Sequence, residues 1–114
     1  MKEFDFDKEL EACKKKQRED ETIVYTVGCG RMCPLPTDKK AIKKGMKEAM
    51  EYIKKLDGFV GVHPVDLWHT LLLFETVNNA KSARNLLKAK DISCANYVVP
   101  ILVENKYLKE QRNE

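Results

Sequence analysis

The chain has 114 residues, of which 43% are hydrophobic and 34% charged, and its formal net charge is +3. This length predicts a single domain, and so small a charge excludes the strongly basic field that is typical of a dedicated nucleic-acid-binding protein. The longest apolar runs fall far short of the roughly 20 residues that cross a membrane, and the acidic N-terminus is unlike a signal peptide.

We therefore expect a cytoplasmic protein whose four cysteines are reduced thiols rather than disulfides. The basic residues are distributed unevenly along the chain. Residues 22–57 contain eight basic and four acidic side chains, whereas residues 1–21 contain six basic and eight acidic ones. The positive charge therefore gathers on the central part of the chain.

Hydrophobic spacing, capping residues and turn residues predict helices and strands along the whole chain. Aspartate caps the first predicted helix at Asp5 or Asp7, and Gly58 ends the second helix. The predicted elements are a helix at 7–18, a strand at Thr22–Val27, a helix from Thr37 or Asp38 to Leu56, strands at Phe59–Val65 and Thr70–Thr76, a helix from Asn78 or Asn79 to Lys90, a strand at Tyr97–Val103 and a polar tail from Glu104 with room for one or two helical turns.

The order strand-helix-strand-strand-helix-strand predicts an α+β, ferredoxin-like body at residues 22–103. Residues 1–21 form an N-terminal helical extension, and 104–114 form a short tail. In this topology the first and third strands are interior and the other two are edges. Pro64 and Pro100 fall in the two predicted edge strands, where a missing N–H group is tolerated.

The third and fourth strands are apolar on both faces, so the sheet face opposite the two main helices is not expected to contact water. The sequence allows two alternatives for what covers this face. Either the N-terminal helix folds across this face, or a second copy of the chain does so in a homodimer.

The loop Gly28–Pro36 precedes the central helix and holds two of the four cysteines. A helix N-terminus attracts negative charge, so Cys33 is a candidate nucleophile, with Arg31 stabilising its thiolate and His63 or His69 as a base. No complete catalytic signature accompanies this loop. The missing signature favours a binding protein over an enzyme, and a metal- or thiol-dependent protein stays the alternative.

The predicted strand order brings sulfur and imidazole groups to one end of the sheet. Zinc binds such ligands, so zinc is the candidate cofactor. The alternative is that the cysteines are small buried apolar side chains. The candidate metal ligands are Cys29, Cys33, Cys94, His63 and His69.

Lysines along the predicted central helix form a solvent-facing row that is either a hydrated surface or a set of phosphate contacts. Trp68 lies in a predicted turn, where it either covers the end of the core or anchors a partner. The candidate binding residues are Arg31, Trp68, Lys39, Lys43 and Lys47.

The segment Thr70–Ile92, with its apolar strand ending in Phe74 and its alanine-spaced helix, resembles small uncharacterised proteins of phages and mobile elements with a ferredoxin-like body. The segment is also similar to thiol-carrier-like ferredoxin folds, but their C-terminal cysteine motif is missing here. The resemblance implies an accessory protein that binds a host macromolecule, such as an anti-defence inhibitor. A host protein is the expected partner, a nucleic acid is the alternative, and no membrane is expected.

Overall fold

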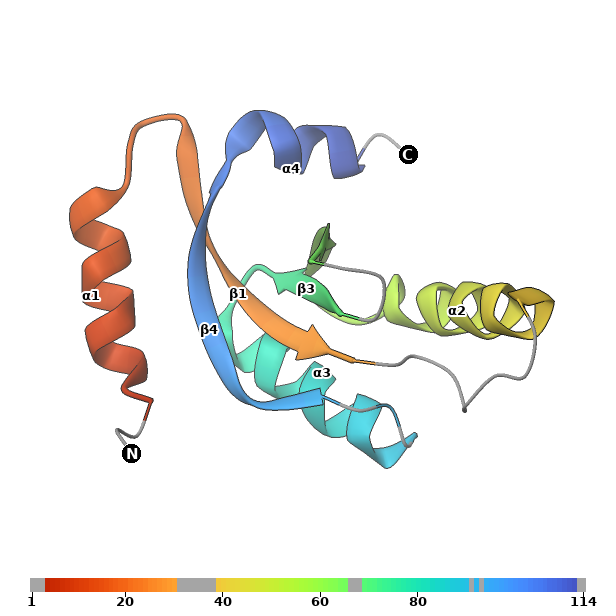
Figure 1. The fold of residues 1–114 in the computed structure, drawn as a ribbon. Coiled ribbons are helices and arrows are strands. Elements are labelled where there is room, and N and C mark those ends of the chain that lie inside the picture. Colours follow the sequence, from red (N-terminus) through yellow and green to blue (C-terminus); the bar gives the residue numbers. More distant parts are fainter. Residues whose placement is uncertain (1–3, 31–38, 66–68, 91, 93, 113–114) are drawn as a thin grey trace.

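A four-stranded antiparallel sheet with strand order β2-β3-β1-β4 organises the fold (Figure 1). The computed structural model describes residues 4–30, 39–65, 69–90, 92 and 94–112. In this described part, four helices and four strands form a mixed α+β fold. The elements are α1 (Phe6–Lys16), β1 (Glu21–Cys29), α2 (Lys39–Ile53), β2 (Phe59–Pro64), β3 (Thr70–Phe74), α3 (Val77–Ala89), β4 (Cys94–Glu104) and α4 (Asn105–Arg112).

The two prolines lie in the edge strands, as the sequence predicts. Pro64 ends β2 and Pro100 lies within β4, and these strands form the two edges of the sheet. The interior strands, β1 and β3, contain no proline. Because a proline cannot donate a ladder hydrogen bond, it is tolerated where the N–H group would face away from the sheet. The predicted division into interior and edge strands is confirmed.

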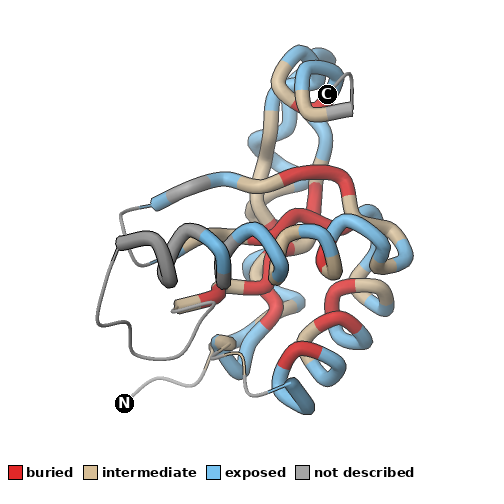
Figure 2. The backbone as a smooth tube through the Cα atoms, turned by 90° about the vertical axis from the view of Figure 1, so that its right-hand side faces the viewer, coloured by how far each residue is buried: buried red, intermediate tan, exposed pale blue. Residues whose placement is uncertain are grey.

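One face of the sheet packs against α2 and α3. Ile53 of α2 and Leu87 of α3 are fully buried against Leu72, Phe74 and Val27 of the sheet. Figure 2 shows buried residues in the strands and on one side of a helix. The spacing of apolar residues in α3 predicts an inward face of Ala80, Ala83, Leu86 and Leu87. Ala80, Ala83 and Leu87 are buried, but Leu86 is 48% exposed, so the prediction for Leu86 is wrong.

The helix ends agree in part with the prediction. Asp5 caps α1, and its side chain accepts a hydrogen bond from the Lys8 N–H group at 3.1 Å. The predicted caps of α3, Asn78 or Asn79, are wrong, because Thr76 caps this helix and accepts from the Asn79 N–H group. A threonine hydroxyl three residues before that N–H group satisfies it, so the helix begins earlier than predicted.

Both strands that carry cysteines are longer than the sequence predicts. The strand predicted at Thr22–Val27 continues to Cys29, and the strand predicted at Tyr97–Val103 begins at Cys94. Glycines around Cys29 suggested a loop there, but Gly28 and Cys29 pair with β3, and Cys29 also pairs with β4. Backbone hydrogen bonds to two neighbouring strands therefore overcome the turn preference of the glycines.

The C-terminal helix α4 covers the second face of the sheet, which corrects the prediction that the N-terminal helix does so. Leu108 of α4 is 7% exposed and packs in a cluster with Val24, Val60 and Leu73. The predicted polar tail is therefore an amphipathic helix. The sequence allowed one or two helical turns in this tail but did not predict their packing on the sheet, because α4 presents only Tyr107 and Leu108 as large apolar side chains and follows β4 directly.

The N-terminal helix α1 lies beside the edge strand β4 instead (Figure 1). The ring of Phe6 lies 6.1 Å from that of Tyr25, and Phe6 packs against the cluster on the α2 and α3 face. The Cys13 thiol donates to the Pro100 carbonyl, with a sulfur–oxygen distance of 3.5 Å. The alternative covering, a second copy of the chain, stays a prediction.

The edge strand β2 is capped in a similar way by α4. Gln111 accepts a hydrogen bond from the Val62 N–H group at 3.3 Å, and the Tyr107 hydroxyl donates to the Val62 carbonyl. Gly61 permits this approach because it has no side chain: a Cβ there would lie 2.8 Å from Cγ of Gln111. Its φ of +157° is also a backbone conformation that other residues rarely adopt. Side chains from a terminal helix thus satisfy edge groups that would otherwise pair with another strand.

We expect Leu108→Ala to destabilise the protein by about 2–4 kcal/mol, because it removes a buried side chain and leaves a cavity between α4 and the sheet. Chemical denaturation followed by circular dichroism measures this loss. The control is Lys109→Ala, since Lys109 is exposed on the same helix. An equal stability of the two variants would show that α4 is not packed on the sheet.

Candidate functional site

Two cysteine side chains meet at the end of the sheet where β1 and β4 pair. Cys29 and Cys94 are directly opposed residues of these strands, and their sulfur atoms lie 3.6 Å apart. Both are free thiols. Cys29 is 1% exposed, whereas Cys94 is partly accessible to solvent. The site is therefore a dithiol with one buried and one accessible sulfur.

The two thiols differ in acidity. A hydrogen bond from the Cys29 thiol lowers the pKa of Cys94, burial opposes this shift, and the positive charges of Lys88 and Arg84 add to it. The same hydrogen bond, together with burial and the charge of Cys94, raises the pKa of Cys29. Because the thiolate is the reactive form of cysteine, these directions favour Cys94 as the more reactive thiol and Cys29 as the protonated one.

A cavity of about 360 Å³ adjoins this pair. Its lining comes from the ends of β1, β3 and β4 and from the residues just before β3. His69 lies in this lining together with both cysteines, so the structure brings together three of the five predicted metal ligands. The lining residues are Gly28, Cys29, Gly30, Val65, His69, Thr70, Leu71, Cys94 and Ala95.

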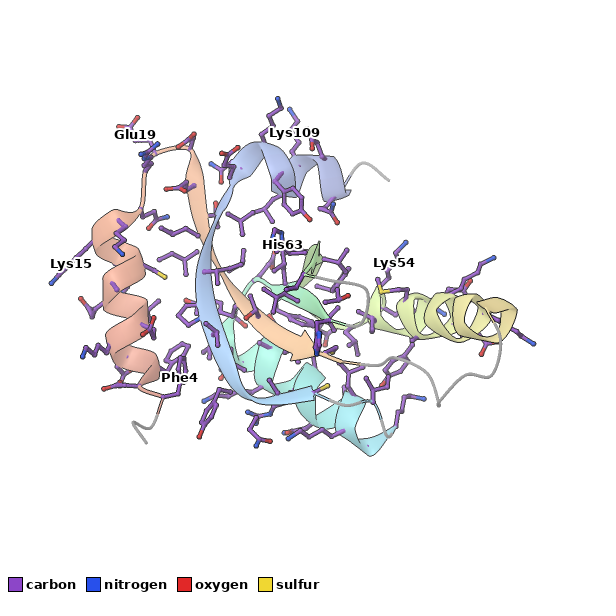
Figure 3. All side chains as sticks on the ribbon, viewed as in Figure 1. Phe4, Lys15, Glu19, Lys54, His63 and Lys109 are labelled. Atoms are coloured by element: carbon purple, nitrogen blue, oxygen red, sulfur yellow. The ribbon has the colours of Figure 1, made fainter. Side chains whose placement is uncertain are left out.

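The structure does not bring His63 to the cysteines. His63 lies on the α4 side of the sheet, where its ring is 6.1 Å from the ring of Tyr107 (Figure 3). Side chains alternate between the faces of a strand, and Val62, next to His63, faces the cluster that contains Cys29. The strand register places His63 near the same end of the sheet as Cys29 and Cys94, but on the opposite face.

The predicted ligand Cys33 lies outside the described residues. Within the described residues, no three histidine, cysteine, aspartate or glutamate side chains are arranged to hold a metal ion. Two thiolates and one imidazole would suit zinc by their chemistry. Zinc binding therefore stays a prediction that depends on Cys33 or on another ligand.

Most of the predicted binding surface also lies outside the described part of the structure. Arg31 and Trp68 are not among the described residues, and the side chains of Lys39 and Lys43 are not described. Lys47 is exposed on α2, as predicted. Other lysines that are exposed on or just after this helix are Lys44, Lys54 and Lys55.

Sequence reasoning missed the two basic residues of α3 that act on Cys94. Arg84 donates to the Asn96 carbonyl at 2.8 Å, and Lys88 donates to the Asn96 side-chain oxygen at 2.5 Å. The signal in the sequence was their spacing, because residues four apart lie on one side of a helix. Recognising their role required the docking of α3 on β4.

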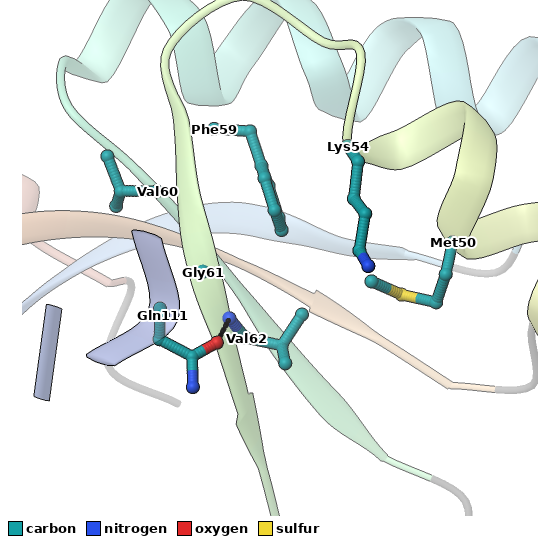
Figure 4. A pocket seen from close by; sticks show the side chains of 7 residues that line it. All are labelled: Met50, Lys54, Phe59, Val60, Gly61, Val62 and Gln111. Atoms are coloured by element: carbon teal, nitrogen blue, oxygen red, sulfur yellow. Dashed lines mark hydrogen bonds between the residues drawn. The ribbon is translucent and has the colours of Figure 1, made fainter. Parts of the chain in front are cut away.

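A second cavity, of about 320 Å³, lies between α2, the edge strand β2 and α4 (Figure 4). Met50, Phe59 and Val62 contribute apolar side chains to it, and Lys54 lies at its border. Its lining contains no thiol, imidazole or carboxylate among the described residues. The cavity beside the cysteine pair therefore offers more reactive groups than this one does.

Comparisons with known proteins find no match, neither to a family model, nor to a curated protein, nor to a solved structure. Among the described residues, no helix is both long enough and apolar enough to cross a membrane.

We expect Cys94 to react with iodoacetamide at least about tenfold faster than Cys29, because it is accessible and more acidic. The rate of Cys94 alkylation should rise with pH, and the midpoint of this rise should lie at a lower pH than for an ordinary thiol. In Cys29→Ala this midpoint should move upward, since the hydrogen bond that stabilises the thiolate is lost. Mass spectrometry of alkylated peptides measures both effects.

The control thiol for this experiment is Cys13. Its pKa is raised by partial burial and by the charge of Glu9, so it should react more slowly than Cys94. A midpoint for Cys94 that does not change in Cys29→Ala would contradict the assigned hydrogen bond.

Proposed function

We propose that this protein acts through thiol–disulfide exchange at the pair Cys29–Cys94. The observation that carries the proposal is the 3.6 Å separation of the two sulfur atoms across β1 and β4. Opposed residues of antiparallel strands have Cα atoms roughly 4.5 or 5.5 Å apart, and both values lie within the range of disulfides. A bond between the two sulfurs therefore requires no rearrangement of the sheet.

The roles of the two cysteines follow from their accessibility and acidity. The Cys94 thiolate attacks one sulfur of a small disulfide, forms a mixed disulfide and releases one thiolate. Cys29 then loses its proton and attacks the Cys94 sulfur, which releases the second thiolate. Overall, the protein dithiol is oxidised to a disulfide and the small disulfide is reduced to two thiols.

The oxidised form would join residues 65 positions apart in the chain. A cross-link of this loop length lowers the conformational entropy of the unfolded chain, which raises the free energy of unfolding by up to about 4 kcal/mol. The reaction would also tie the edge strand β4 covalently to the interior strand β1. Oxidation thus stabilises one end of the sheet.

We expect a low-molecular-weight disulfide to convert the native protein to a form that has lost two thiols and contains a Cys29–Cys94 bond. Peptide mass mapping identifies this bond, and denaturation measures a gain in stability of up to about 4 kcal/mol. Cys94→Ser should abolish the conversion, whereas Cys13→Ser should leave it unchanged. A folded protein whose pair stays reduced under these conditions would overturn the proposal.

We also propose a ferredoxin-like class for the body of the protein. Support comes from the element order of residues 21–104, from the interior position of β1 and β3, and from the packing of α2 and α3 on one face. This class alone implies no function, because one fold supports many activities.

A second candidate function is the binding of a host macromolecule by an accessory protein of phage or mobile-element type. The observation that favours it is the exposed lysines Lys44, Lys47, Lys54 and Lys55 on and just after α2. Glu48 and Glu51 are exposed on the same helix and reduce its positive field. Of the two possible partners, a host protein and a nucleic acid, the exposed lysines favour a nucleic acid.

If the lysines of α2 contact phosphates, the affinity of the protein for a nucleic acid of mixed sequence should fall steeply as the salt concentration rises. Lys47→Glu should then reduce the slope of log affinity against log salt by about one. Fluorescence anisotropy measures this slope, and Lys109→Glu on α4 is the matched control. Equal slopes for the two variants would exclude phosphate contacts through Lys47.

A further inference from the structure

We propose that the substrate of the Cys29–Cys94 pair is an anionic disulfide whose carboxylates are bound by Arg84 and Lys88 of α3. This inference rests on the proposed thiol–disulfide exchange and adds the chemical class of the substrate. It is carried by the position of two basic side chains beside the accessible thiol.

Both basic side chains are held against β4 close to Cys94. The Arg84 guanidinium donates to the Asn96 carbonyl, and the Lys88 ammonium donates to the Asn96 side-chain oxygen. Asn96 lies two residues after Cys94 on the same strand. Asn96 therefore holds two cations from one helix, and both lie within electrostatic range of Cys94.

The partners that the structure describes for these two cations are uncharged. In the described part of the chain, neither Arg84 nor Lys88 forms an ion pair with a carboxylate, and their acceptors are amide oxygens. The described acidic residue nearest to them in sequence is Glu75, which precedes α3. A substrate carboxylate would thus find two cations that no carboxylate of the described residues pairs with.

This charge acts on the exchange reaction in two ways. It attracts a negatively charged disulfide to Cys94, and it stabilises the thiolate that leaves during the attack. A positively charged disulfide of similar size would be repelled. Because the two cations are partly exposed to water, added salt should weaken both effects.

Three disulfides of different charge test the inference. They are glutathione disulfide, which is anionic, 2-hydroxyethyl disulfide, which is neutral, and cystamine, which is cationic. The protein carries Cys13→Ser and Cys33→Ser, so that only the pair reacts. Loss of its two thiols, followed by mass spectrometry, gives the rate of oxidation by each compound.

We expect the anionic compound to react about tenfold faster than the cationic one at low salt, with the neutral compound in between. High salt should reduce this ratio. The double variant Arg84→Gln and Lys88→Gln should bring the ratio close to one, whereas Lys81→Gln, an exposed lysine on the same helix, should not change it. The ratio is the informative quantity, because a changed Cys94 pKa alters all three rates together.

Equal rates for the three compounds with the unaltered charges of α3 would overturn the inference and leave the proposed function standing. An unchanged ratio in the folded double variant would overturn it as well. If none of the three compounds oxidises the pair, the proposed function fails and the inference fails with it. The salt dependence of the ratio needs no variant, so a double variant that does not fold leaves the test intact.

Discussion

The pairing of β1 with β3 and β4 as far as Cys29 is the constraint on which the rest of this structure depends. It turns a glycine-flanked cysteine into a strand residue and places it directly opposite Cys94. The close approach of the two sulfurs follows from this register, because opposed side chains on one face of a sheet are near neighbours. A shift of one residue would move Cys29 to the other face.

The two terminal helices protect the edges of this sheet in related ways. On β2, α4 supplies Gln111 and Tyr107 to the exposed backbone groups of Val62. On β4, α1 supplies the thiol of Cys13 to the Pro100 carbonyl. Pro64 of β2 and Pro100 of β4 lack a backbone N–H group. On each of these strands, a side chain of a terminal helix bonds to a backbone N–H or carbonyl group. The sheet is thereby shielded from pairing with other strands.

The same packing that closes the core makes the two thiols differ in accessibility and acidity. The hydrogen bond between them, together with burial, raises the pKa of Cys29, and the same hydrogen bond, together with Lys88 and Arg84 of α3, lowers the pKa of Cys94. The helix thus contributes apolar side chains on one side and positive charge at the border with β4. In the proposed exchange reaction, this difference would assign the first attack to Cys94 and the second to Cys29.

Local patterns in the sequence determined the types and order of the elements from α1 to β4, the interior and edge strands, and most of the inward face of α3, with Ala80, Ala83 and Leu87. These features depend on residue spacing and on the missing N–H group of proline, which act within a few residues. The extension of β1 to Cys29, the face on which His63 lies, and the docking of α4 and of Arg84 with Lys88 were decided only by the tertiary structure. Each of these depends on register or on contacts between distant segments, since the energy of such contacts outweighs the local preference of the chain.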